Sequence, residues 1–168
     1  YQIEILSLSA LGTIIMTGIL FYRDRKLEQQ AGICLPDKAP LSKYWTVFVF
    51  GIAGGIAATC LMAMAQIAFY DERYQQTAQI AYSAGLPVQI IGLGIIVPVA
   101  EELMFRGILH KRFRERQPFW YSAVCSALLF AFIHSSTTQL IYTFLLGILL
   151  SYLYEKFGSL RAPILLHI

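Results

Sequence analysis

The chain has 168 residues, of which 57% are hydrophobic and only 14% are charged, and its mean hydropathy is +0.60. A soluble domain of this length normally carries about a quarter charged residues. The charges are also grouped in blocks, and the long apolar stretches between them require an apolar solvent. The composition therefore excludes an ordinary soluble domain and predicts a membrane protein, while the net charge of +3 says little by itself.

Six apolar runs alternate with polar segments along the chain. They cover residues 3–22, 44–69, 88–109, 119–134 and 139–154, and a sixth run begins at Arg161. We expect an all-α fold, a polytopic transmembrane helix bundle of about six spans, with the last span truncated. No repeat or domain boundary is visible, so residues 1–168 are expected to form a single transmembrane domain. Both ends are expected to be the limits of a longer chain.

The positions of Lys and Arg predict the orientation of these spans. Segment 23–43 contains five basic residues, 110–117 contains four and 155–161 contains two, whereas 70–87 contains one. Cytoplasmic loops are enriched in Lys and Arg, so the three basic segments are expected on the cytoplasmic side. These basic segments are explained as solvated helix ends next to anionic lipid, and no further function is assigned to them.

Two adjacent carboxyl groups, Glu101 and Glu102, lie within the third apolar run. Near a helix centre an acidic residue in a bilayer costs roughly 2.5–3.5 kcal/mol, so such residues usually face a wet cavity. Glu102 and Arg106 are four residues apart and can pair on one helix face. Glu101 points about 100° away and is freer to face a water. The alternative is a purely structural charge cluster, and Pro98 predicts a kink one turn earlier.

Two histidines complete a candidate site. His134 ends the fourth apolar run, with Phe130 one turn before it, and His167 lies in the sixth run, one turn after Pro163. A single intramembrane histidine could be a hydrogen-bonded core residue. Two histidines on different helices together with a buried glutamate indicate a catalytic site.

Other intramembrane protease chemistries fit poorly. The chain has no His-Glu-x-x-His zinc motif and no Gly-x-Ser-x-Gly elbow. Tyr70-Asp71 matches half of an aspartyl protease motif, and we interpret this match as accidental. Cys60 and Cys125 lie in apolar runs without a cationic neighbour, which favours inert thiols, and Cys34 has no close cysteine partner.

Together these residues resemble the motifs of the CAAX-processing and bacteriocin-processing endopeptidases, often called the CPBP or Abi family. The Glu-Glu-x-x-x-Arg motif, the Phe-x-x-x-His motif and the start of a His-x-x-x-Asn motif occur in that order over about residues 88–168. The matching residues are Glu101, Glu102, Arg106, Phe130, His134 and His167, with Phe105 and Gly107 as typical flanking residues. The asparagine of the third motif would be residue 171, beyond the chain given.

The resemblance implies a helical bundle with a cavity open toward the cytoplasm. It implies that Glu101 is a general base acting on a water with help from His134, and that His167 stabilises the oxyanion. Glu102 and Arg106 would hold the site together. The family is commonly described as metalloproteases, and Glu101, His134 and His167 could bind zinc through one oxygen and two nitrogens. A metal-free glutamate mechanism is the alternative, and the sequence leaves both open.

The resulting hypothesis is an intramembrane endopeptidase in the bacterial cytoplasmic membrane that cleaves a membrane-associated peptide or a lipidated protein tail. Membrane lipids are its other expected partners, and nucleic acid is not expected. One alternative is a non-catalytic relative that binds a membrane partner or confers bacteriocin immunity. A small-solute transporter is less well supported, because no inverted repeat is visible.

Overall fold

The computed structural model describes residues 2–31, 38–65, 70–134 and 136–168, and within these ranges every regular element is helical. The elements are α1 (Gln2–Gln30), η1 (Leu41–Lys43), α2 (Tyr44–Ala65), α4 (Glu72–Ser83), η2 (Val88–Ile96), α5 (Val97–Glu102), η3 (Leu103–His110), α6 (Lys111–Arg114), α7 (Phe119–Phe132), α8 (Thr137–Phe157) and α9 (Arg161–His167). The segments η2 and η3 are π-helical. The expected all-α fold is confirmed.

Each of the six predicted apolar runs forms a helix. Four helical stretches are long and apolar enough to cross a membrane, namely Gln2–Gln30, Leu41–Leu61, Val88–Arg114 and Thr137–Phe157. The fourth run forms α7, a shorter apolar helix, and the sixth forms α9, which has seven residues. The end of the second run, residues 66–69, lies outside the described residues.

The outer surface of the bundle is apolar. Ile15, Phe50 and Leu145 are each more than 60% exposed, and many other large apolar side chains on α1, α2 and α8 are exposed as well. A contiguous apolar surface of this extent is unusual for a soluble monomer. Lipid is the solvent that it fits, so the chain is an integral membrane protein.

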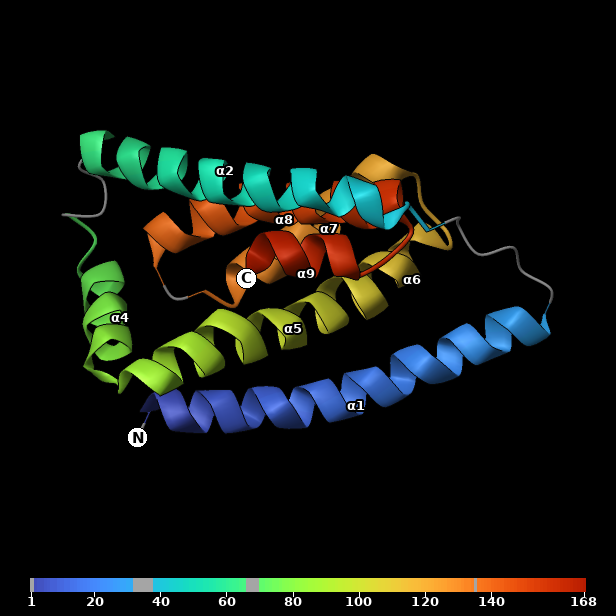
Figure 1. The fold of residues 1–168 in the computed structure, drawn as a ribbon, viewed down its shortest axis with the longest axis horizontal. Helices are drawn as coiled ribbons and strands as arrows, with labels where there is room; N and C mark the ends of the chain where they lie inside the picture. Colours follow the sequence, from blue (N-terminus) through green and yellow to red (C-terminus); the bar gives the residue numbers. More distant parts are fainter. Residues whose placement is uncertain (1, 32–37, 66–69, 135) are drawn as a thin grey trace.

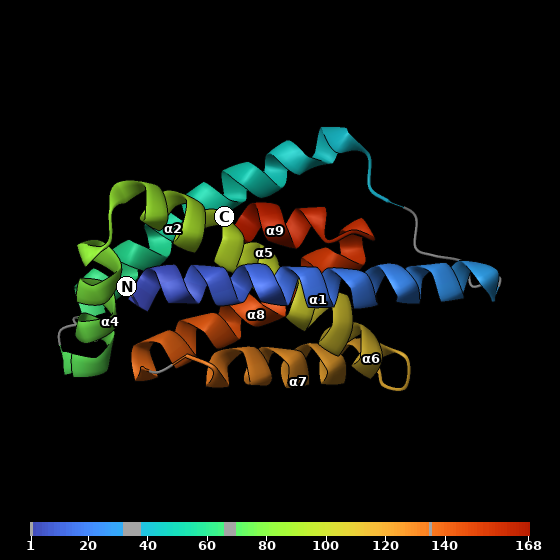
Figure 2. The same ribbon diagram turned by 90° about the horizontal axis from the view of Figure 1, so that it is seen from below.

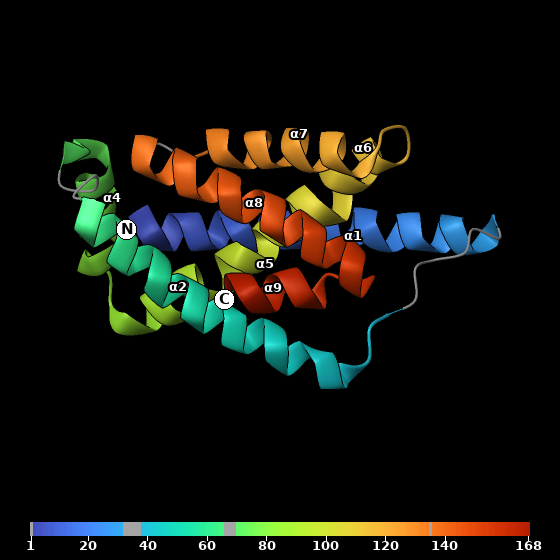
Figure 3. The same ribbon diagram turned by 90° about the horizontal axis from the view of Figure 1, so that it is seen from above.

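The long helices run side by side along one axis, and α4 lies across one end of them (Figure 1). The segments η2, α5 and η3 form one continuous helix, and α1 packs along its whole length. Helix α7 pairs with α8, and α2 packs against α9 (Figure 3). The centre of the bundle, where α5, η3, α7, α8 and α9 meet, holds the candidate site.

A tight turn brings the last helix back into the bundle. Helix α8 ends at Gly158, whose φ of 59° is in the left-handed region that glycine adopts without strain. Helix α9 then begins at Arg161 and returns along α8, with Pro163 buried in its first turn. This reversal places His167 at the inner end of α9.

Helix α4 is attached to α8 through Asp71. The Asp71 carboxylate accepts a hydrogen bond from the backbone N–H of Tyr74 at 3.0 Å, which caps α4. It also accepts bonds from the backbone N–H and the hydroxyl of Thr138, both at 2.8 Å. These bonds hold the pKa of Asp71 below its ordinary value, and the backbone hydrogen bond from Thr138 has the largest effect. Asp71 is thus a capping residue, in agreement with the interpretation of the Tyr70-Asp71 match as accidental.

The basic segments gather at the end of the bundle opposite α4. The C-terminal half of α1, α6 and the turn between α8 and α9 lie together there (Figure 2). Lys111 pairs with Glu28 at 2.8 Å, and Arg112 pairs with Asp24 at 2.8 Å. We call this the basic end. Its placement on the cytoplasmic side stays a prediction.

Candidate active site

The two glutamates lie where the third span changes its helical form. Helix α5 is a short α-helical stretch between the π-helical segments η2 and η3, and Pro98 is buried near its start. Proline lacks an N–H, so the backbone must change its bonding pattern there. π-Helical turns are rare and occur frequently at functional sites. The predicted kink at Pro98 is thus a change of helix type within a continuous helix.

Glu102 and Arg106 form the ion pair that their spacing predicts. An Arg106 terminal nitrogen donates to Glu102 Oε1 at 2.9 Å, and both side chains are completely buried. Breaking such a pair by removing one partner usually costs about 3–5 kcal/mol, because the other charge is left buried and uncompensated. The pair therefore anchors the centre of the bundle.

Two further contacts hold the guanidinium of Arg106. It donates a 3.1 Å hydrogen bond to the carbonyl of Gly147, and its central carbon lies 4.7 Å from the centroid of the Phe130 ring. Gly147 allows this because α7 and α8 are very close there. A Cβ on Gly147 would lie 2.8 Å from Ala127 Cβ and 3.3 Å from Arg106. Sequence reasoning missed Gly147. The small residues Ala123, Ala127 and Ala131 along one face of α7 were an available signal for such close packing.

His167 lies between the two glutamates. Its Nδ1 is 2.8 Å from Glu102 Oε1, and its Nε2 is 3.6 Å from Glu101 Oε2. Since a carboxylate only accepts, Nδ1 carries a hydrogen and donates it to Glu102. The 3.6 Å separation is within ion-pair distance and too long for a direct hydrogen bond, so a water can contact both atoms from one side but cannot lie between them.

The two glutamates differ in exposure, as their helical positions predict. The Glu102 side chain is fully buried, whereas 18% of the Glu101 side chain is exposed. Glu102 binds Arg106 and His167 through one oxygen, while Glu101 faces His167 at 3.6 Å. Glu102 is thus placed to hold Arg106 and His167, whereas part of the Glu101 carboxylate is exposed.

His134 joins this group through Phe130. Its ring centroid lies 5.1 Å from that of Phe130, and the His167 centroid lies 5.7 Å from Phe130 as well. His134 Nδ1 donates to the Phe130 carbonyl at 2.9 Å, which leaves Nε2 available as a proton acceptor. Among the described contacts, none joins His134 directly to Glu101. His167 is the imidazole next to both carboxylates.

Glu101, His134 and His167 are the donor groups of the expected metal site. In the described part of the chain, no group of three or more His, Cys, Asp or Glu side chains is arranged to hold a metal ion. One oxygen of Glu102 is already shared by Arg106 and His167. In this arrangement the described side chains form no zinc-binding group, and a metal requirement stays a prediction.

The site lies near the middle of the long helices. Glu101 is 13 residues from each end of the helical stretch Val88–Arg114. Gly147, whose carbonyl binds Arg106, is ten residues from each end of α8. His134 lies closer to the α4 end, two residues before the cap of α8.

Fold and site define an all-helical integral membrane protein with a buried Glu-Glu-x-x-x-Arg pair and a histidine from another helix. A family model described as "Type II CAAX prenyl endopeptidase Rce1-like" matches residues 83–168. This match covers half of the chain and includes every candidate site residue. The chain belongs to the type II CAAX prenyl endopeptidase Rce1-like family, which is a protease family.

Two bacterial proteins are similar to this chain. One is named "Putative membrane peptidase YdiL", from Bacillus subtilis, with 26% identity over 135 residues, covering 79% of this chain and 54% of the relative. The other, an "Uncharacterized 24.3 kDa protein" from Escherichia coli, is 35% identical over 83 residues, covering 46% of this chain and 38% of the relative. The chain therefore spans about half or less of these relatives' length. No solved structure matches it.

Proposed function

We propose that this chain carries the active site of an intramembrane endopeptidase that cleaves a membrane-associated or lipidated peptide. The observation that carries the proposal is the line of contacts from Arg106 through Glu102 and His167 to the partly exposed Glu101. Membership of a protease family and the name of the Bacillus relative support it. A purely structural charge cluster would not need the partly exposed carboxylate of Glu101.

In this mechanism Glu101 is the general base. It accepts a proton from a water, and the water oxygen attacks the carbonyl carbon of the scissile peptide bond. The C–N bond then breaks, and the leaving nitrogen takes the proton back from the Glu101 carboxyl. A base must lie within about 3 Å of the water or act through one more water. The exposed side of the Glu101–His167 pair is a suitable position for that water, within reach of the Glu101 carboxylate.

The two histidines have separate roles in this proposal. His167 is held by Glu102 through Nδ1, so its Nε2 faces Glu101 and is placed to interact with the developing oxyanion of a substrate at this site. His134 offers its free Nε2 as a second proton acceptor near the same Phe130 ring. Glu102 and Arg106 keep His167 in position and take no part in the proton transfer.

The direct test uses the purified chain in proteoliposomes. The probes are an internally quenched peptide with a farnesylated CAAX tail and the same peptide without the lipid. Glu101→Gln keeps the shape of the side chain and removes the base, so kcat/KM should fall by about 10²–10⁴-fold while the melting temperature is unchanged. Cleavage by the variant at the normal rate would disprove the role of Glu101.

The non-catalytic alternative gives a different result. A partner-binding relative would bind the farnesylated peptide equally well as the wild-type chain and as the Glu101→Gln variant, and neither protein would cleave it. The metal hypothesis is separated in the same assay. A chelator should leave cleavage unchanged if the protein groups act alone, and loss of activity that zinc restores would require a metal-dependent mechanism.

We also propose that the protein lies in a bacterial cytoplasmic membrane with the basic end toward the cytoplasm. The Lys and Arg positions and the bacterial relatives support this orientation. Single cysteines at Lys38 and Gln76, in a chain whose native cysteines are replaced by alanine, should react with an impermeant maleimide from opposite sides. Labelling of both from one side would overturn the orientation.

A further inference from the structure

A row of buried polar side chains continues along the third span from the candidate site toward the basic end. It consists of Glu102, Arg106 and His110, and all three side chains are fully buried. Residues four apart lie on one side of a helix, so the three side chains share a face. We call them the His110 row. The ion pair accounts for Glu102 and Arg106, whereas nothing in the site requires a buried histidine one turn further on.

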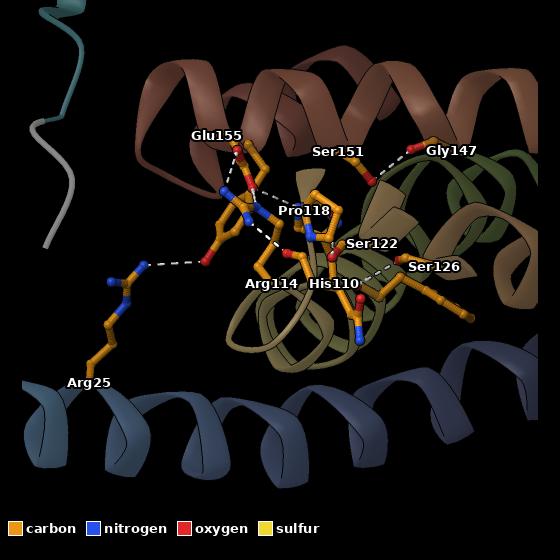
Figure 4. Close-up of polar contacts among 12 residues, drawn as sticks. Arg25, His110, Arg114, Pro118, Ser122, Ser126, Gly147, Ser151 and Glu155 are labelled. Atoms are coloured by element: carbon orange, nitrogen blue, oxygen red, sulfur yellow. Dashed lines mark hydrogen bonds and ion pairs between the residues drawn. The ribbon is translucent and has the colours of Figure 1, made fainter. Parts of the chain in front are cut away.

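Helix α8 presents a second polar row to the first. Gly147, Ser151 and Glu155 are also spaced four residues apart. The Gly147 carbonyl accepts from Arg106 at 3.1 Å, and Glu155 Oε1 is 3.3 Å from His110 Nε2. Ser151 lies between these two contacts along α8, and its hydroxyl donates to the Gly147 carbonyl at 3.0 Å (Figure 4). Polar groups therefore face one another from the centre of the bundle to the basic end.

Helix α7 adds buried hydroxyl groups beside these rows. Ser126 donates to the Phe105 carbonyl of η3 at 3.1 Å, and Ser122 donates to the Pro118 carbonyl at 3.1 Å (Figure 4). Both serines are fully buried. A hydroxyl that donates its hydrogen keeps lone pairs that can accept another hydrogen bond. The surroundings of the His110 row are thus polar on three helices.

Three buried atoms of the His110 row have no hydrogen-bond partner among the described protein groups. They are Glu102 Oε2, Arg106 Nε and His110 Nδ1. The other nitrogen of His110 faces the Glu155 carboxylate, which only accepts, so Nε2 carries a hydrogen and Nδ1 of the neutral ring is an acceptor. Buried polar atoms are costly to leave unpaired, and those without a protein partner typically bind ordered water.

The chemistry of these three atoms selects water over an ion. Arg106 Nε is a donor, whereas Glu102 Oε2 and His110 Nδ1 are acceptors, and a water molecule can accept from the first and donate to the others. An anion would be repelled by the Glu102 carboxylate, and a cation would be repelled by the Arg106 guanidinium. Either ion would also lose its hydration on burial.

We infer that the His110 row binds a short chain of water molecules, which joins the Glu102–Arg106 pair to the basic end. At that end Glu155 contacts both His110 and Arg114, and the Glu155 and Arg114 side chains are 32% and 37% exposed. The row therefore ends at solvent, and bulk water reaches the centre of the bundle without crossing lipid. The inference goes beyond the proposed peptidase function and does not depend on it.

The test compares two buried thiols by X-ray radiolysis in nanodiscs, in a chain whose native cysteines are replaced by alanine. Ser151→Cys places a thiol beside the His110 row, and Ala162→Cys places one in the apolar cluster with Leu153 and Phe157. Both positions are 0% exposed. Radiolysis turns bound water into hydroxyl radicals that oxidise the side chains next to it. Mass spectrometry should show severalfold faster oxidation at position 151 than at position 162, and equal rates would overturn the inference.

Two further variants link the oxidation to the His110 row. Ser126→Cys repeats the measurement from α7, in case Ser151→Cys does not fold, and should also be oxidised faster than Ala162→Cys. His110→Phe, added to the Ser151→Cys chain, removes a water acceptor, so oxidation at position 151 should fall toward the rate at position 162. An unchanged rate would show that the row does not hold the water. None of these measurements uses cleavage, so an inactive chain with fast oxidation would contradict the peptidase proposal alone.

Discussion

The bundle contains two groups of charged residues with similar composition and different surroundings. The central network of Arg106, Glu102, His167 and Glu101 lies where five helical segments meet, and its Glu102–Arg106 pair is fully buried. The basic end also has several ion pairs, and Glu155 contacts both His110 and Arg114 there (Figure 4). Arg112 and Arg114 are open to solvent there, with 53% and 37% of their side chains exposed, whereas the Lys111–Glu28 pair is largely buried.

This difference in exposure decides what each group does. Exposed ion pairs contribute about 0–1 kcal/mol, because water screens them and the long side chains lose entropy. A broken buried pair costs about 3–5 kcal/mol. The central network is thus a structural anchor that also positions a histidine, whereas the pairs of Arg112 and Arg114 at the basic end are solvated. Four substitutions test the comparison.

The largest expected effect comes from Glu102→Gln. This change leaves the Arg106 guanidinium buried without its counter-charge and weakens the bond to His167 Nδ1. The free energy of unfolding in detergent should fall by about 3–5 kcal/mol. Denaturant titration followed by tryptophan fluorescence provides the measurement. A loss below about 1 kcal/mol would place this pair in the same class as the exposed pairs.

Gly147→Ala should have the next largest effect. The added methyl group would lie 2.8 Å from Ala127 Cβ, so α7 and α8 must separate and the carbonyl that holds Arg106 must move. Overpacking of this kind costs about 1–3 kcal/mol. Gly54→Ala is the matched control, because nothing lies within 4 Å of its added methyl group. Equal unfolding midpoints for the two variants would contradict the close packing of α7 on α8.

A smaller, pH-dependent effect is expected from Asp71→Asn. The native pKa of Asp71 is below its ordinary value because of hydrogen bonds from Thr138 and Tyr74. The ionised carboxylate therefore stabilises the folded state above the ordinary pKa of aspartate, and this contribution is lost as the pH falls through the native pKa. The melting temperature of the Asp71→Asn variant should be below that of the wild type at neutral pH, and the two should converge in acid. If the two melting temperatures differed by the same amount at every pH, the effect would come from the shape of the side chain and not from its charge.

The smallest effect is expected at the basic end. Arg112→Gln removes ion pairs to Asp24 and Glu115, but 53% of the Arg112 side chain is exposed. The free energy of unfolding should change by less than about 1 kcal/mol, and the change should shrink further in high salt. A salt-independent loss comparable to that of Glu102→Gln would remove the distinction between the two groups.

The sequence predicted those parts of the fold and site that depend on local spacing. Apolar runs longer than a membrane is thick predict spans, and the four-residue separation of Glu102 and Arg106 predicts their pairing, which the structure shows. It could not predict contacts that depend on how helices meet. The carbonyl of Gly147 binds Arg106 from another helix, and the glutamates' nearest imidazole is that of His167 instead of His134. The rise per residue of a helix predicts how deep a residue lies along that helix, but it does not predict which faces of two helices meet.

The length of α7 has a consequence for hydration. Its 14 residues span about 21 Å, less than the roughly 30 Å of a hydrocarbon core. Exposed Trp120 and Tyr121 are suited to hold its first turn at one headgroup layer. The turn at Ile133 and His134 then lies inside hydrocarbon depth, where irregular backbone persists only if it is covered by protein or wetted. Local thinning of the bilayer around this hydrophobic mismatch would bring bulk water toward His134, which is one route for the water that the proposed mechanism requires.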